Sequence, residues 1–259
     1  DAHIYCSEDQ FEQEFMGVVD LYRKYFDLFG IEKFVMRLSL HGKAGLGKKY
    51  VDNERLWLKT EEMVRRAMDN GGVPYVEVED EAAFYGPKIE YTLKDAIGRQ
   101  WQCGTMQVDF SMAERLDAEY VGEDGARHRP VMLHRAIVGS LERFIGILIE
   151  EHAGAMPVWL APVQVVITGI TDAQGDYAQH VAKTLRNQGL RVQTDLRNEK
   201  ITYKIREHSL QKLPYILVVG DKERQAGAVA VRARGNQDLG VMSLDAFAKR
   251  IAADIASKA

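Results

Sequence analysis

Two histidines far apart in the sequence, His3 and His134, are the side chains best suited to binding a metal ion. Imidazole is the commonest nitrogen ligand of zinc, and a catalytic zinc takes about three protein ligands and keeps one position open. Cys6 and Cys103 are candidates for a third, thiolate ligand, although neither lies at a diagnostic spacing. Histidines of a core or surface, and small buried cysteines, are the alternative interpretation.

The segment 84–88, with the sequence FYGPK, could bring a positive charge to an anionic ligand. Gly86 permits a close approach of the backbone, and Pro87 stiffens the turn. Lys88 could then direct its ammonium group to a phosphate or a carboxylate, with the phenol of Tyr85 nearby. The alternative is an ordinary β-turn with a solvated lysine.

Three polar residues, Gln102, Thr105 and Gln107, are expected on one face of a strand, from which all three could project into one cleft. The residues between them point the other way or leave space. Polar residues on such a face are also typical of the solvated side of a sheet, so this pattern does not by itself indicate a site.

Arg143 lies in the first turn of an apolar helix that follows a strand, close to Ser140 and Glu142. The free amide groups at the start of a helix favour anions, so an arginine there is suited to an anionic ligand. The competing interpretation is an exposed arginine that pairs with Glu142 or Glu151.

The first 155 residues that carry these side chains have the pattern of an antiparallel sheet with helices packed on one side, which is an α+β fold. Helical spacing occurs at 11–29 and 54–70, alternation at 34–40 and in three short segments between 75 and 110, and a strand–turn–helix at 131–151. The turn at 97–99 predicts an antiparallel hairpin of the last two short segments. The apolar stripe of the final helix is formed by Leu141, Phe144, Ile145, Leu148 and Ile149.

A domain boundary is expected within 150–162, because Gly154 stops a helix and Pro157 and Pro162 prevent its resumption. We therefore divide the chain into domains 1–156 and 157–259. The second has strands alternating with helices, which predicts a compact α/β domain. Strands are expected at 163–168, 190–194, 215–219 and 228–233, and helices at 172–187, 199–212 and 244–257.

Composition excludes several classes of protein. No apolar run approaches the ~20 residues of a membrane helix, two cysteines cannot build a disulfide scaffold, and no secretory leader is recognised; a cytosolic protein is expected. Residues 159–259 carry 15 Lys and Arg against 10 Asp and Glu, whereas the preceding part is acidic. A basic second module is compatible with binding a polyanion, and equally with ordinary solvated charge.

Seven segments closely resemble, in their order along the chain, the bacterial threonyl-tRNA synthetases, a family of class II aminoacyl-tRNA synthetases. They are DAHIYC, FYGPKIEYTL, QCGTMQVDF, YVGED, PVMLHRAIVGSLERFIGILIEE, TDLRNEKITYKIREH and PYILVVGDKE. The resemblance covers essentially the whole chain. It implies a partial class II catalytic domain of antiparallel-sheet type at 1–156 and an α/β anticodon-binding domain at 157–259. The segment GSLERFIGILIE resembles motif 3, whose arginine contacts ATP.

The resemblance also implies an activity: ATP-dependent activation of L-threonine to threonyl-adenylate and its transfer to the 3′ end of tRNA(Thr). Zinc would hold the substrate through two ligands that match His3 and His134, with a third ligand, a cysteine, from a segment upstream of Asp1. Mg²⁺ would accompany ATP. The remaining matches are Asp1 near the threonine hydroxyl, Tyr85 near the amino group, Lys88 near the reacting phosphate or carboxylate, Gln102, Thr105, Gln107 and Ser140 around the nucleotide and terminal adenosine, and Arg143 on ATP.

In the second domain the positions that match anticodon-reading residues are Asn198, Lys200, Glu223 and Arg232. Unstacked loop bases of RNA are read by polar side chains of this kind, with basic residues on the backbone. The implied partners are therefore tRNA(Thr), ATP, L-threonine and, for the full-length protein, a second copy in a homodimer. No membrane partner is implied.

The family's motif 1, its motif 2 arginine and the zinc-ligating cysteine all precede the position that matches Asp1. For a molecule of 259 residues only, we therefore expect weak zinc binding, no aminoacylation and impaired dimerisation. One alternative is a non-catalytic class II relative that binds RNA or serves as an accessory protein. The other is a zinc hydrolase, for which no HExxH or comparable motif is found.

Overall fold

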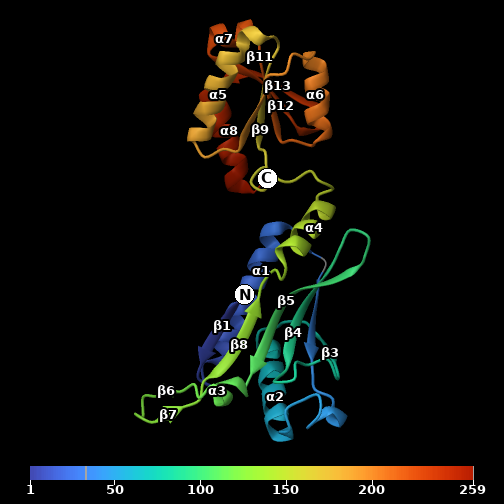
Figure 1. Ribbon diagram of the computed structural model, residues 1–259, viewed down its shortest axis with the longest axis vertical. Coiled ribbons are helices and arrows are strands. Elements are labelled where there is room, and N and C mark those ends of the chain that lie inside the picture. Colours follow the sequence, from blue (N-terminus) through green and yellow to red (C-terminus); the bar gives the residue numbers. More distant parts are fainter. Residues whose placement is uncertain (33, 259) are drawn as a thin grey trace. The chain divides into compact units, whose positions relative to one another are not determined.

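The computed structural model describes residues 1–32 and 34–258, which form two compact units, 1–148 and 149–259. Figure 1 shows a long sheet with helices in the first unit and an α/β arrangement in the second. Each unit is described by itself below. The domain boundary expected between residues 156 and 157 stays a prediction.

The first unit is organised by a six-stranded sheet with the strand order β1-β8-β5-β4-β2-β3. Every neighbouring pair is antiparallel except β2 and β3, which run parallel. The strands are β1 (Ala2–Cys6), β2 (Phe34–Ser39), β3 (Val76–Val78), β4 (Lys88–Lys94), β5 (Gln100–Asp109) and β8 (Val131–Ala136). The expected α+β class and the hairpin of β4 and β5 are confirmed. The pairing of β1 with β8 was not foreseen, because a five-residue strand at the start of the chain has too short a pattern.

Two long helices, α1 (Phe11–Phe29) and α2 (Glu54–Asn70), form within the expected bounds. Helix α1 ends at Gly30, which adopts the left-handed conformation that stops a helix. Tyr22 of α1 is fully buried, and its ring stacks on that of Tyr91 of β4 with the ring centroids 3.7 Å apart. Its hydroxyl donates a hydrogen bond of 2.7 Å to the carbonyl of Ala136. One face of the sheet is therefore an apolar core covered by α1, and the opposite face is left for polar side chains.

Shorter elements complete the unit: a 3₁₀ turn η1 (Lys43–Gly45), α3 (Met112–Arg115), a hairpin of β6 (Tyr120–Val121) and β7 (Arg127–His128), and α4 (Leu141–Glu151). The expected apolar stripe of α4 needs correction. Its buried residues are Phe144, Ile147 and Leu148, whereas Leu141, Ile145 and Ile149 are 63%, 52% and 49% exposed. The spacing of apolar residues predicts which side of a helix is buried, but the number of residues buried on that side depends on the elements that pack against it.

The second unit is a five-stranded sheet in the order β10-β9-β11-β12-β13. The strands β10, β9 and β11 pair in parallel, whereas β11 with β12 and β12 with β13 pair antiparallel. The strands are β9 (Val165–Gly169), β10 (Val192–Asp195), β11 (Tyr215–Val219), β12 (Ala228–Ala233) and β13 (Gln237–Ser243). The helices are η2 (Asp172–Gln174), α5 (Gly175–Asn187), α6 (Ile201–Leu210), α7 (Asp221–Ala226), η3 (Arg234–Asn236) and α8 (Leu244–Ser257).

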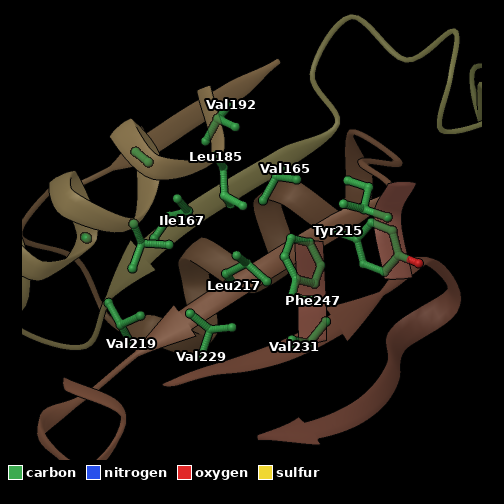
Figure 2. Close-up of a cluster of buried hydrophobic side chains, with 14 of the residues drawn as sticks. Val165, Ile167, Leu185, Val192, Tyr215, Leu217, Val219, Val229, Val231 and Phe247 are labelled. Atoms are coloured by element: carbon green, nitrogen blue, oxygen red, sulfur yellow. The ribbon is translucent and has the colours of Figure 1, made fainter. Parts of the chain in front are cut away.

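The core of this unit lies between the sheet and the helices α5 and α8. Figure 2 shows Val165, Ile167 and Leu217 from parallel strands packing with Leu185 of α5 and Phe247 of α8. A second apolar layer on the other face of the sheet lies under α6. Both faces are covered, which explains why the central strands are continuous apolar runs that could be recognised in the sequence.

The strands β11 and β12 and the helix α8 have the bounds expected from the sequence, and α6 is shorter at both ends. The prediction missed α7 and β13, because the six residues of α7 are too few for a period and β13 has mostly exposed residues on both faces. Over the described residues, none of the helices combines the length and apolarity needed to cross a membrane.

Candidate functional site

A row of side chains crosses the polar face of the first sheet at one level. His3 of β1 lies directly opposite His134 of β8, and His134 lies opposite Gln107 of β5. Gln107 in turn lies opposite Lys88 of β4, which lies opposite Ser39 of β2. Directly opposed residues share a face of the sheet, so five strands bring these side chains side by side. Residues 131 positions apart in the sequence, His3 and His134, thus become neighbours.

The histidine pair has a defined geometry. The ring centroids are 4.7 Å apart and the rings are nearly perpendicular. The Nε2 atom of His134 lies 2.9 Å from Oδ2 of Asp109, whose side chain is fully buried. The other oxygen of Asp109 accepts hydrogen bonds of 2.9 Å from the amides of Ser111 and Met112, at the start of α3. Asp109 therefore orients the His134 ring and favours the tautomer with a proton on Nε2, which leaves a lone pair on Nδ1.

Asp109 was not singled out in the sequence. Its signal was available in principle, because it ends a strand whose alternation places it on the face of Gln107, and it precedes a short helix that needs a capping acceptor. An aspartate followed by serine is, however, common in turns, so its role as a partner of His134 emerges only from the pairing of β5 with β8.

Lys88 is not a solvated surface lysine. Its side chain is 18% exposed, and its Nζ atom lies 2.8 Å from Oε1 of Glu90, a buried residue on the same face of β4. Glu90 also accepts a hydrogen bond of 3.0 Å from the hydroxyl of Ser39. The ammonium group is thereby held over the polar face by a carboxylate and can turn to an anionic ligand when one competes with Glu90.

The turn before β4 is as tightly packed as its sequence suggests. A Cβ atom on Gly86 would lie 1.7 Å from the carbonyl oxygen of Val108, so no other residue fits there. This close approach places Tyr85 beside the row, where its hydroxyl donates a hydrogen bond to Oε1 of Gln107 and its ring lies 5.5 Å from that of His134. Burial raises the pKa of Tyr85, so the phenol remains protonated and available as a donor.

A β-bulge brings Gln102 to the polar face with Thr105. Tyr91 pairs with Gly104 and the next residue of β4 pairs with Gln102, so Cys103 is an extra residue in β5. Without this bulge Gln102 and Thr105, three positions apart, would point to opposite faces, since side chains alternate along a strand. The expectation that both share a face with Gln107 therefore depends on a feature that the sequence analysis did not include.

The start of α4 packs against this bulge. Gly139 has a φ of +67° and a Cβ on it would lie 2.3 Å from the carbonyl oxygen of Cys103. Ser140 accepts a hydrogen bond from the amide of Arg143 at 3.3 Å and donates one to Glu142 at 2.7 Å. Arg143 does not pair with Glu142 or Glu151. Its guanidinium donates a hydrogen bond of 2.7 Å to the carbonyl of Gln102.

Asp1 is exposed and precedes β1, two residues before His3. Both cysteines are buried, and burial raises their pKa values to about 11, so the two thiols are protonated near neutral pH. This favours the interpretation of Cys6 and Cys103 as small core residues rather than thiolate ligands. Among residues 1–32 and 34–258 no group of three or more His, Cys, Asp or Glu side chains could hold a metal ion. The described chain thus offers two adjacent imidazoles, one ligand short of a catalytic zinc site.

In the second unit three of the four candidate RNA-binding residues lie at the carboxyl ends of parallel strands, whereas Arg232 lies on the antiparallel strand β12, opposite the amino end of β11. Asn198 and Lys200 are exposed in the segment between β10 and α6, and Glu223 follows β11 at the start of α7. Glu223 accepts a hydrogen bond of 2.9 Å from the amide of Gly220. Arg232 lies deeper along the sheet, opposite Ile216, with Asp238 at 3.4 Å.

A buried polar network anchors the segment that carries Asn198. Asp195, at the end of β10, receives two hydrogen bonds from the guanidinium of Arg197, of 2.9 and 2.7 Å, and lies 2.8 Å from Nε2 of His208. Arg197 also contacts Glu207 of α6 at 3.0 Å. The hydrogen bonds from Arg197, with a further one from His208, hold the pKa of Asp195 well below its ordinary value. This network ties β10 to α6 and fixes both ends of the exposed segment.

Comparisons with known families divide the chain in the same order. The profile of the tRNA synthetase class II core domain (G, H, P, S and T) matches residues 1–152, and that of the anticodon binding domain matches residues 163–254. Together these matches account for both units.

Individual relatives agree with the family profiles. A protein of Polaromonas sp. (strain JS666) named threonine–tRNA ligase is 66% identical over 259 residues, and one of Delftia acidovorans with the same name is 64% identical over 263 residues. Each match covers the whole chain but 40% of the relative, so the chain spans less than half the length of these relatives.

Solved structures show the same fold. A structure titled as the RNA binding domain of threonyl-tRNA synthetase from Cryptosporidium parvum is 32% identical, with a TM-score of 0.89 over 97% of this chain and 62% of its own. A structure titled as a putative threonyl-tRNA synthetase from Aeropyrum pernix is 27% identical, with a TM-score of 0.77, and the match covers 99% of this chain and 63% of that one. The chain belongs to the class II tRNA synthetase family, as a catalytic-core segment followed by an anticodon-binding domain.

Proposed function

We propose that this chain is the catalytic-core and anticodon-binding part of a threonine–tRNA ligase. The reaction would activate L-threonine with ATP and transfer it to the 3′ end of tRNA(Thr). The observation that carries the proposal is the row of opposed polar side chains across five strands, in a chain 66% identical to a protein named threonine–tRNA ligase. We place this function in the cytoplasm, with a homodimer as the working assembly.

The two opposed imidazoles, His3 and His134, support a zinc site with one further ligand from outside the described residues. Asp109 favours a lone pair on Nδ1 of His134, as a metal ligand requires. The chemistry supplied by such a metal is the recognition of a hydroxyl beside an amino group, which separates threonine from valine where an apolar pocket would not. Asp1, close to His3, is proposed to accept a hydrogen bond from that hydroxyl.

The first chemical step in this proposal is the in-line attack of the threonine carboxylate on the α-phosphate of ATP, with pyrophosphate as the leaving group. It requires positioning and charge neutralisation more than a strong base. Lys88 exchanges Glu90 for the reacting phosphate or carboxylate, and Tyr85 holds the substrate amino group. Arg143 binds ATP, whose polyphosphate also carries Mg²⁺.

The polar side chains of β5 and the start of α4 complete the proposed nucleotide pocket. Gln102 and Thr105 share the polar face because of the bulge at Cys103, and Gln107 connects them to the histidines. Ser140 follows at the first turn of α4. The same pocket takes the terminal adenosine of tRNA in the second step, in which the ribose hydroxyl attacks the threonyl-adenylate carbonyl and AMP leaves.

The second domain, which we place at 157–259, is proposed to read the anticodon. Asn198 and Lys200 are exposed in a segment that is anchored at both ends, and Glu223 lies beyond the carboxyl end of β11, which β9 separates from β10. Arg232 adds a positive charge that Asp238 holds from β13. The net positive charge of this domain supports contact with the RNA backbone.

Threonine-dependent ATP–pyrophosphate exchange tests the proposal. We expect exchange with threonine and serine but not valine when the chain is joined to the preceding segment of the Polaromonas sp. (strain JS666) relative, and none with the 259-residue chain by itself. The variants His134→Ala and Lys88→Ala of the joined protein should lose exchange by at least about 100-fold. Exchange that is equal with valine, or absent while tRNA still binds tightly, would refute the proposal, and the second result would favour a non-catalytic RNA-binding protein.

A further inference from the structure

Arg143 occupies the free edge of β5 beyond the end of β8. Strand β8 ends at Ala136, opposite Thr105, so the carbonyl of Gln102 has no partner from that strand. The guanidinium of Arg143 takes this place with a hydrogen bond of 2.7 Å. A single hydrogen bond to a carbonyl would let a long side chain rotate, so the orientation of the guanidinium needs a second contact.

The second contact is the indole of Trp101. The guanidinium carbon of Arg143 lies over this ring, 5.7 Å from its centroid, which is within the range of a cation–π interaction. The indole is itself fixed, because its Nε1 donates a hydrogen bond of 2.8 Å to Oδ2 of Asp95. The side chain of Asp95 is fully buried.

Asp95 organises the β4–β5 turn around this indole. Its other oxygen accepts hydrogen bonds from the amides of Ile97 at 3.2 Å and Arg99 at 2.8 Å, and the guanidinium of Arg99 contacts Oδ2. Burial acts to raise the pKa of Asp95, but the hydrogen bonds from Trp101 and Arg99 outweigh it and lower the pKa to about 2. The acceptor is therefore charged and immobile at neutral pH.

The register decides from which side the indole approaches. Trp101 lies opposite Leu93, a fully buried core residue, whereas Gln102 lies on the polar face with Thr105. The indole thus reaches the guanidinium of Arg143 from the core side of the strand. The side of the guanidinium that faces the polar residues is not covered by Trp101.

We propose that Trp101, anchored by Asp95, is a positioning residue that holds Arg143 at the rim of the polar face for a nucleoside triphosphate. This rests on the function proposed above, in which Arg143 binds ATP. The turn of the β4–β5 hairpin, remote from the histidines, then contributes to nucleotide affinity through one aromatic ring.

A double-mutant cycle on the protein joined to the preceding segment of the Polaromonas sp. (strain JS666) relative tests the proposal, with the Kd for Mg–ATP measured by isothermal titration calorimetry. We expect Trp101→Ala to weaken binding about two- to five-fold, as for one partly exposed cation–π contact, and Trp101→Phe to weaken it less. In a background of Arg143→Ala the same substitution should have no further effect, because the side chain that it positions is gone. Ile97→Ala, at an exposed position of the same turn, is the matched control and should leave Kd unchanged.

A nitrogen–proton NMR spectrum of the arginine side chains supplies a readout independent of ATP. The Nε–H signal of Arg143, assigned by its loss in Arg143→Lys, should shift and exchange faster with water in Trp101→Ala, and should keep its position in Ile97→Ala. An unchanged Arg143 signal in Trp101→Ala overturns the proposal, as does an additive effect on Kd in the double variant.

The two proposals fail in different ways. If the joined protein shows the same ATP affinity with and without Arg143→Ala, or none in either case, the role of Arg143 in nucleotide binding is contradicted. The NMR comparison still decides whether Trp101 positions Arg143. If Arg143→Ala weakens binding and Trp101→Ala does not, the proposed function stands and the positioning role of Trp101 is refuted.

Discussion

Replacing Asp195 by asparagine should destabilise the second unit by about 3 kcal/mol. Asparagine keeps one acceptor oxygen, but its amide nitrogen must take the place of one carboxylate oxygen. At the position of Oδ2 it would face Nη2 of Arg197 and Nε2 of His208, from which Asp195 now accepts bonds of 2.7 and 2.8 Å. At the position of Oδ1 it would face Nε and the amide of Arg197, from which Asp195 accepts bonds of 2.9 and 3.2 Å. Two hydrogen bonds to a charged acceptor are lost, each contributing about 1.5–3 kcal/mol. We expect a total loss near the lower end of this range, because the Arg197 side chain is 49% exposed to solvent and keeps its ion pair with Glu207.

The stability difference between the original chain and Asp195→Asn should also depend on pH. The folded-state pKa of Asp195 is depressed, so its contribution is complete above the unfolded value of about 3.9 and is lost as the pH falls below it. The difference between the original chain and Asp195→Asn should therefore be constant from pH 5 to pH 7. It should be smaller by about 1 kcal/mol at pH 3, where most of the unfolded carboxylates are protonated.

Hydrogen exchange of the backbone amides of β10 and α6 measures this difference locally and avoids assuming that the two units unfold together. Asp176→Asn, at an exposed position in the first turn of α5, is the control and should change stability by less than about 0.5 kcal/mol. A loss below about 1 kcal/mol for Asp195→Asn, or one that stays the same at pH 3, would refute the account of Asp195 as a charged, buried acceptor.

Three further predictions concern the first unit. Gly86→Ala should destabilise the first unit by at least about 3 kcal/mol in thermal unfolding, because the new methyl group would overlap the carbonyl of Val108. A change in stability of less than about 0.5 kcal/mol would contradict this close approach. Asp109→Asn should release the His134 ring, so that nitrogen NMR shows a mixture of tautomers in place of a predominant Nε2-protonated form; an unaltered spectrum would show that Asp109 does not orient the ring. The two buried cysteines should react with a thiol reagent at pH 7.4 only after denaturant is added, since their pKa values are near 11, and rapid labelling of the folded chain would argue for an accessible thiolate.

Much of the fold was available from the sequence because the elements are long or fully buried. Helix α1 has a stripe of apolar residues over 19 positions, and β11 is an unbroken apolar run between two covered faces. The elements that were missed, such as β1, α7 and β13, are short or exposed, so no period distinguishes them from loops.

The candidate site was predictable as a set of residues only through the resemblance to a family. The residues by themselves left His3 and His134 as ordinary histidines, since nothing in their spacing implies that β1 and β8 pair in register. Asp109 and Trp101, which orient His134 and contact Arg143, were not recognised, because supporting residues show no pattern until their neighbours are placed.

The bulge at Cys103 also shapes the backbone of β5 next to the start of α4. With the extra residue, the part of the strand near the turn and the part near the histidines are out of phase by one position. Deleting Cys103 would restore regular pairing, but Gln102 would stay opposite Thr92 and Trp101 opposite Leu93, so neither side chain would change face. The deletion would instead remove the carbonyl against which Gly139 packs, so the extra residue of β5 supports the start of α4, where Ser140 and Arg143 lie.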